Sequence, residues 1–149
     1  EGAAPVLETL AAAADHRAEG DGMPSLVGCV VIGGALSEGV DFAGELACGA
    51  FVFGPGLPAV TEERKLMQEY YDREMGAGFE YAFMYPGLAR VGQAAGRVLR
   101  GPTERGVIVL FGARFAEPRY RELLPAYWQD EAVQSEDPDP AVRAFWSAS

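Results

Sequence analysis

The sequence predicts an α/β protein in which helices cover a parallel sheet. Three short apolar runs have the composition of buried strands: Leu26–Ile32, Gly49–Phe53 and Val107–Phe111. Segments with helical patterns separate these runs, and parallel strands need such crossover connections. With 149 residues the chain is in the size range of one domain. We expect a single domain over residues 1–149, with its core at about 5–128 and an acidic, loosely held tail at 129–149.

Local signals place the first helices. A run without helix breakers at Val6–Arg17 predicts a helix that ends at Glu19–Gly22. Thr61 is a suitable N-cap for another helix that runs to about Glu74, since acidic residues follow it in the first turn. Short helices are also predicted at Pro118–Leu124 and Ala141–Trp146. This order is typical of a RecA-like lobe with helices on both faces of its sheet, and the few strands predict an incomplete lobe.

Aromatic residues fill the segment Phe79–Tyr85. Tyr81, Phe83 and Tyr85 alternate with other residue types, which predicts a short strand-like segment with about half of its side chains in the core. Stacking on nucleic acid bases is the alternative, because single-strand binders use aromatic rings in this way. Packing is the favoured interpretation, as it also is for Tyr127, Trp128 and Trp146.

A helix that starts at Pro86 and stops at Gly101 carries the main candidate site. Each helical residue advances by about 100°, so Gln93, Arg97 and Arg100 share one face. The apolar stripe on the opposite side would pack against the sheet; it comprises Leu88, Val91, Ala95 and Leu99. Two guanidinium groups and an amide suit the terminal phosphates of a nucleotide. The alternative is an ordinary amphipathic helix whose arginines face solvent.

A polar loop that includes Ser37, Glu38, Gly39 and Asp41 follows the first predicted strand. Such folds bind their ligands at the carboxyl ends of parallel strands. Gly39, like Gly96 in the helix, has no side chain and would allow a backbone to approach closely. A simple solvated turn is the alternative interpretation of the loop.

The formal net charge of −10 argues at first against nucleic acid as a partner. The charge is unevenly distributed, because Pro86–Pro125 holds seven arginines and three glutamates, for a local charge of +4, and the rest sums to −14. A surface that attracts anions is therefore compatible with an acidic chain. Cys29 and Cys48 lie in apolar runs, where we expect buried thiols, and two cysteines alone form no zinc or iron–sulfur site. We expect a cytoplasmic protein without a membrane span.

Two ordered motifs resemble those of superfamily 2 helicases of the DinG/XPD iron–sulfur type, over roughly residues 26–128. Residues 34–42, Gly-Ala-Leu-Ser-Glu-Gly-Val-Asp-Phe, look like motif V of this family. Residues 93–100, Gln-Ala-Ala-Gly-Arg-Val-Leu-Arg, look like motif VI, and the strand at 107–111 follows at the matching place. The phosphate-binding loop, the metal-binding acids and the four-cysteine segment of the family are absent from this sequence, and we expect them upstream.

The resemblance implies roles for the motif VI residues. Arg97 and Arg100 match arginine fingers, which reach the phosphates of ATP held with Mg²⁺ mainly by the other lobe. Gln93 matches the leading glutamine of the motif, near the same phosphates. The resemblance further implies an iron–sulfur cluster in the parent protein, outside this chain.

The resemblance implies roles for the motif V loop as well. Glu38 and Asp41 match acids that link the nucleotide site to the surface that binds the strand. Ser37 matches a position near the nucleic acid backbone. Gly39 lies between Glu38 and Asp41. The implied partners are single-stranded DNA and the N-terminal helicase lobe of the same parent chain.

Two functions are therefore open. The first is the second motor lobe of an ATP-dependent DNA helicase, inactive alone. The second is a non-catalytic, acidic protein-interaction module that keeps the RecA-like shape. A Ser-His-Asp hydrolase has little support, because the only histidine, His16, lies in a predicted surface helix away from any serine motif.

Overall fold

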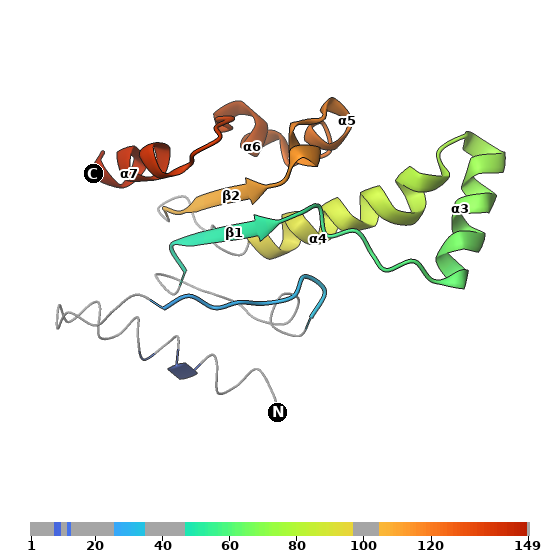
Figure 1. Ribbon diagram of the computed structural model, residues 1–149, viewed down its shortest axis with the longest axis horizontal. Coiled ribbons are helices and arrows are strands. Elements are labelled where there is room, and N and C mark those ends of the chain that lie inside the picture. Colours follow the sequence, from blue (N-terminus) through green and yellow to red (C-terminus); the bar gives the residue numbers. More distant parts are fainter. Residues whose placement is uncertain (1–7, 10–11, 13–25, 35–46, 97–104, 149) are drawn as a thin grey trace.

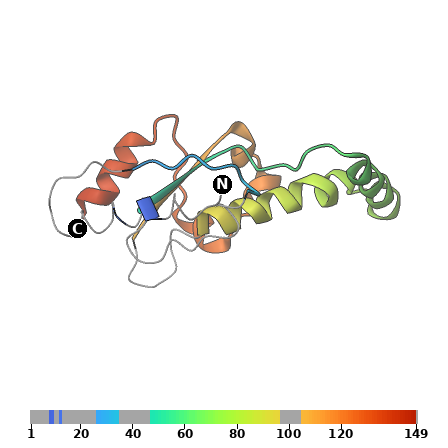
Figure 2. The same ribbon diagram turned by 90° about the horizontal axis from the view of Figure 1, so that it is seen from below.

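The computed structural model describes residues 8–9, 12, 26–34, 47–96 and 105–148. In these residues the fold consists of two strands and a series of helices (Figure 1). In chain order they are β1 (Gly49–Phe53), α3 (Glu62–Met75), the π-helix η2 (Glu80–Met84), α4 (Tyr85–Ala95), β2 (Val107–Phe111), the 3₁₀-helix η4 (Ala113–Ala116), α5 (Pro118–Arg121), α6 (Ala126–Glu131) and α7 (Asp139–Ser147). Helices α3 and α7 lie at opposite ends of the molecule (Figures 1 and 2).

The two described strands are parallel, as predicted. They pair in register from Gly49 opposite Val107 to Phe53 opposite Phe111. The chain between them passes through α3, η2 and α4, which is the long crossover that parallel neighbours require. This pairing confirms the predicted α/β class, as part of a RecA-like lobe.

One face of the strand pair packs on α4. Buried residues from the strand, the helix and the segment after β2 form the core; they are Val52, Met84, Leu88, Val91, Ala95, Phe115 and Tyr120. The predicted apolar stripe is thus confirmed for Leu88, Val91 and Ala95, while Leu99 lies outside the described residues. The contact is close at Gly87, where an added Cβ would lie 2.7 Å from the carbonyl oxygen of Pro55.

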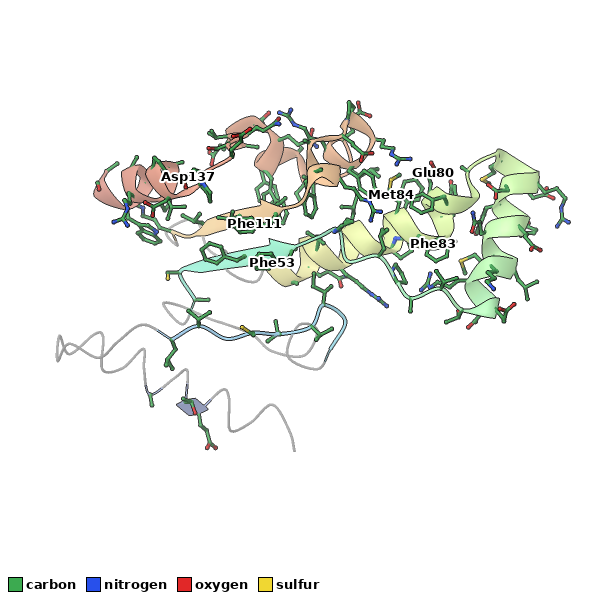
Figure 3. The ribbon with its side chains drawn as sticks, viewed as in Figure 1. Phe53, Glu80, Phe83, Met84, Phe111 and Asp137 are labelled. Carbon is green, nitrogen blue, oxygen red and sulfur yellow. The ribbon has the colours of Figure 1, made fainter. Side chains whose placement is uncertain are left out.

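The other face of the strand pair is exposed within the described part of the chain. Phe53 and Phe111 stack with ring centroids 4.8 Å apart (Figure 3). The ring centroid of Phe51 lies 6.3 Å from that of Phe111. The side chain of Phe53 is 76% exposed. Phe51 and Phe53 flank Val52 in β1, and successive side chains of a strand point to opposite faces of the sheet. The aromatic face is therefore opposite the core face.

Helix α3 begins and ends as its sequence predicts. The hydroxyl of Thr61 accepts a hydrogen bond from the Arg64 N–H at 3.2 Å, which caps the N-terminus. At the C-terminus Gly76 has φ 65°, and the N–H groups of Gly76 and Ala77 bond back to the carbonyls of Asp72 and Tyr71. This is the left-handed glycine cap that turns the chain toward η2.

The prediction of a strand-like segment at Phe79–Tyr85 is wrong, because this segment is helical. The Gly78 N–H donates to the Asp72 carboxylate at 2.7 Å, which satisfies an N–H group at the start of the new helix. Ala82, Phe83 and Met84 are buried in succession, as a helical turn between packed elements permits. Burial and capping here override the alternating pattern.

The prediction of a buried strand at Leu26–Ile32 is also wrong. No described strand pairs with these residues, and most of their side chains are exposed. Ile32 alone among them packs against the core. The expected burial of Cys29 and Cys48 fails for the same reason, since both are free and exposed, one in this run and one just before β1.

The remaining predicted elements are described in part. Of the predicted N-terminal helix, Glu8, Thr9 and Ala12 are helical and the rest lies outside the described residues. The predicted C-terminal helices are present as α5 and α7. In the described ranges, no helix combines the length and the apolar character that a membrane span requires.

Candidate nucleotide-binding helix

The structure describes two of the predicted site residues, Gln93 and Gly96, both at the C-terminal end of α4. The others lie outside the described residues: Ser37, Glu38, Gly39, Asp41, Arg97 and Arg100. The placement of motif V beside motif VI therefore stays a prediction.

Helix α4 has one buried face and one exposed face. Val91 and Ala95 are each 0% exposed and pack into the core, whereas Gln93, halfway between them in sequence, is exposed. Two residues correspond to about 200° on a helix, so Gln93 points away from the sheet. Its amide is therefore accessible to a ligand that approaches the outer face of α4.

Helical hydrogen bonding extends to the residue before Arg97. Gly96 has φ −65° and ψ −9°, and its N–H bonds to the carbonyl of Gly92. An added Cβ at Gly96 would meet only the Tyr127 hydroxyl, at 4.0 Å, so the described surroundings do not require glycine there. Tyr127 is 62% exposed, and the prediction that it is a packing anchor is wrong. Trp128 does pack against the core, as predicted.

Helix α7 contacts Arg105, which lies two residues before β2. The Arg105 guanidinium donates to the Phe145 carbonyl at 2.8 Å and lies 4.9 Å from the ring centroid of Phe145. It also lies 5.7 Å from the ring centroid of Trp146. These contacts join α7 to the segment just before β2.

Sequence reasoning missed two arginines that hold the elements around motif VI. The first is Arg105, and the signal for its contact is the pair of aromatic residues in α7, because aromatic rings are common partners of a guanidinium. The second is Arg64 in α3, whose Nη1 donates to the Ala82 carbonyl at 2.6 Å. The signal for the second contact is Pro86, because a proline inside a helix leaves a carbonyl without its usual donor.

The parallel strands and their helical crossover define this molecule as part of a RecA-like lobe. The chain belongs to the helicase C-terminal domain family, whose sequence model matches residues 8–131. Together with its relatives, this match confirms the resemblance to the C-terminal lobe of DinG/XPD-type superfamily 2 helicases.

The similar curated proteins are much longer than this chain. The ATP-dependent DNA helicase chl1 of Aspergillus clavatus is 28% identical over 127 residues, which cover 74% of this chain and 17% of that protein. The regulator of telomere elongation helicase 1 homolog of Culex quinquefasciatus is 30% identical over 119 residues, 74% of this chain and 12% of its own length. The ATP-dependent DNA helicase chl-1 of Caenorhabditis elegans is 30% identical over 101 residues, which cover 67% of this chain and 12% of that protein.

Proposed function

We propose that this chain is the second motor lobe of an ATP-dependent DNA helicase, and that it contributes arginine fingers to ATP bound at the interface with another lobe. Arg97 and Arg100 would contact the transferred phosphate, and Gln93 would lie beside them. Mg²⁺ and most of the nucleotide would be held by the other lobe, so the lobe would be inactive alone. An iron–sulfur cluster would lie elsewhere in the parent protein.

The observation that supports this proposal most is the two-faced packing of α4. Leu88, Val91 and Ala95 hold the helix against the strand pair, and Gln93 is exposed on the opposite side. A helix held in this way presents its polar face with little freedom to move, as electrostatic stabilisation of a transition state requires. Arg97 follows Gln93 by one helical turn in the sequence, and helical bonding reaches its neighbour Gly96.

The motif V residues would complete the site. Glu38, Gly39 and Asp41, with Gly96 in motif VI, are proposed to line the nucleotide side of the cleft, and Ser37 to contact the backbone of single-stranded DNA. The names of the curated relatives, which are DNA helicases, support DNA as the polymer.

The test is the DNA-stimulated ATPase activity of the full-length helicase that carries this lobe. Arginine fingers contribute about 10³-fold to 10⁵-fold to the rate, so Arg97→Ala or Arg100→Ala should lower kcat by about 10³-fold. The matched control is Arg121→Ala, which removes an exposed arginine from α5 and should leave kcat unchanged. Retained turnover in both motif VI variants would refute the assignment.

A non-catalytic interaction module is the second candidate, and the exposed acids of the tail favour it. Asp130, Glu131, Glu136 and Asp137 are all exposed around the α6–α7 connection. Such a module would bind a basic protein partner. It predicts no ATPase activity in the full-length protein, whereas the motor lobe predicts activity that depends on Arg97.

A further inference from the structure

The helix that leads to the candidate site has a proline in its interior. The chain is helical without interruption from Gly78 through η2 and α4 to Ala95, and Pro86 lies within this stretch. Proline has no N–H, so the carbonyl four residues earlier loses the donor that a regular α-helix would supply. That carbonyl belongs to Ala82, which is 0% exposed. A buried carbonyl without a donor is destabilising, so a replacement is needed.

Arg64 supplies the replacement from a different helix. Its Nη1 donates to the Ala82 carbonyl oxygen at 2.6 Å, in a partly buried position. The backbone of Arg64 is held at the same time, because its N–H bonds to the Thr61 cap.

The backbone just before the proline is π-helical. The Tyr85 N–H bonds to the Glu80 carbonyl, five residues back, in the widened geometry of a π-helix. Phe83 and Met84 from the same turn are buried, and Figure 3 shows them in the segment that joins α3 to α4. Gly78 closes the turn on the α3 side, where an added Cβ would lie 2.2 Å from the Gln68 carbonyl oxygen. The η2 turn that leads into α4 is therefore held against α3 by contacts at Gly78 and Ala82.

We propose that Arg64 is a positioning residue for the motif VI helix: its guanidinium replaces the N–H that Pro86 lacks, and thereby sets the orientation in which α4 carries Gln93 and leads to Arg97. The functional part of this inference rests on the proposed role of motif VI. Its structural part does not, because it concerns only the coupling between Arg64 and Pro86.

The structural part is tested by a double-mutant cycle in the full 149-residue chain. Arg64→Met keeps much of the aliphatic stem and removes the donor, so it should destabilise the protein and raise the unfolding equilibrium constant about tenfold. Pro86→Ala restores a backbone N–H near the Ala82 carbonyl. In the Pro86→Ala background we therefore expect Arg64→Met to raise the unfolding equilibrium constant by less than about threefold.

The matched control is Lys65→Met, on the same helix. Lys65 pairs with Glu62 at 2.7 Å across exposed side chains, so its loss removes one positive charge without touching the Ala82 carbonyl. We expect an effect below about threefold in both backgrounds. The inference would be overturned if Arg64→Met destabilised the protein equally in the unmodified chain and in the Pro86→Ala variant. If Arg64→Met alone does not fold, recovery of folding in the double variant supports the inference, and failure to recover contradicts it.

The functional part is tested in the full-length helicase below its unfolding temperature. Arg64→Met should lower kcat about tenfold with little change in the KM for ATP, because fingers that act in the transition state would be misplaced. Pro86→Ala should restore kcat in the double variant, which a general loss of stability does not predict. If kcat is unchanged in Arg64→Met while the cycle shows coupling between Arg64 and Pro86, the functional part is refuted and Arg64 has a structural role only. An unchanged kcat in Arg97→Ala would refute the proposed function and leave the cycle to decide the structural part.

Discussion

Two glycines of α4 should respond to alanine with opposite signs. Gly87 and Gly92 have helical backbones without positive φ, so alanine should gain about 0.5–1 kcal/mol at either position from helix propensity. At Gly92 the nearest atom to an added Cβ is the Pro125 Cγ, at 4.0 Å, which is an ordinary contact. We therefore expect Gly92→Ala to stabilise the protein by about that amount.

At Gly87 the added methyl group would have no room. Its Cβ would lie 2.7 Å from the Pro55 carbonyl oxygen and 3.2 Å from the carbonyl carbon and oxygen of Gly56. These are backbone atoms of the turn after β1, so relief requires α4 to move away from the strands. Overpacking of this kind costs about 1–3 kcal/mol, and after the propensity gain we expect a net destabilisation of about 1–2 kcal/mol.

Thermal and urea unfolding of the two variants would measure the difference. At about 2–4 °C per kcal/mol for a chain of this size, the melting temperatures of the two variants should differ by about 5–10 °C. Gly87→Ala should melt below the unmodified chain and Gly92→Ala above it. The two variants make the same chemical change on the same helix, so each serves as the control for the other. Equal melting temperatures, or the reverse order, would refute the close packing of α4 against the turn after β1.

Two further predictions concern the tail and the thiols. Arg105→Ala should release α7 from the segment just before β2 and accelerate hydrogen exchange of the α7 amides about tenfold. An exposed cation–π contact contributes about 0.5–1 kcal/mol, and Arg105 makes two such contacts as well as a hydrogen bond. Unchanged exchange would show that α7 is held by other contacts. Cys29 and Cys48 are free and exposed, so both should react with a thiol reagent in the native protein at rates close to those after unfolding. Protection of either thiol before unfolding would contradict its exposed placement.

Local sequence signals located most elements correctly. Thr61 caps α3 as predicted, and the helix ends at Met75, close to the predicted end at about Glu74, because capping depends on residues within a few positions of the helix end. The apolar spacing of Leu88, Val91 and Ala95 identified the buried face of α4, since helical geometry alone sets which residues share a face. The same spacing placed Gln93 on the exposed side.

Other features depended on contacts that the local pattern does not contain. The alternation at Phe79–Tyr85 is typical of a strand, but Asp72 caps a helix there and three successive side chains are buried. The apolar run at Leu26–Ile32 has strand composition, yet composition alone does not provide a hydrogen-bonded neighbour. In both segments the outcome depends on residues distant in sequence.

The sequence by itself determined the α/β class, the boundaries of the capped helix α3, the two faces of α4 and the family, because each of these follows from short-range periodicity or from ordered motifs. Only the tertiary structure showed that Arg64 donates to the Ala82 carbonyl, 18 residues away in the sequence, and that Arg105 donates to the Phe145 carbonyl, 40 residues away. The physical reason is that a carbonyl without a donor can be recognised locally, whereas its partner is selected by the way α3 folds back on the chain. The site therefore has a polar face that the sequence predicts and a support that only the fold provides.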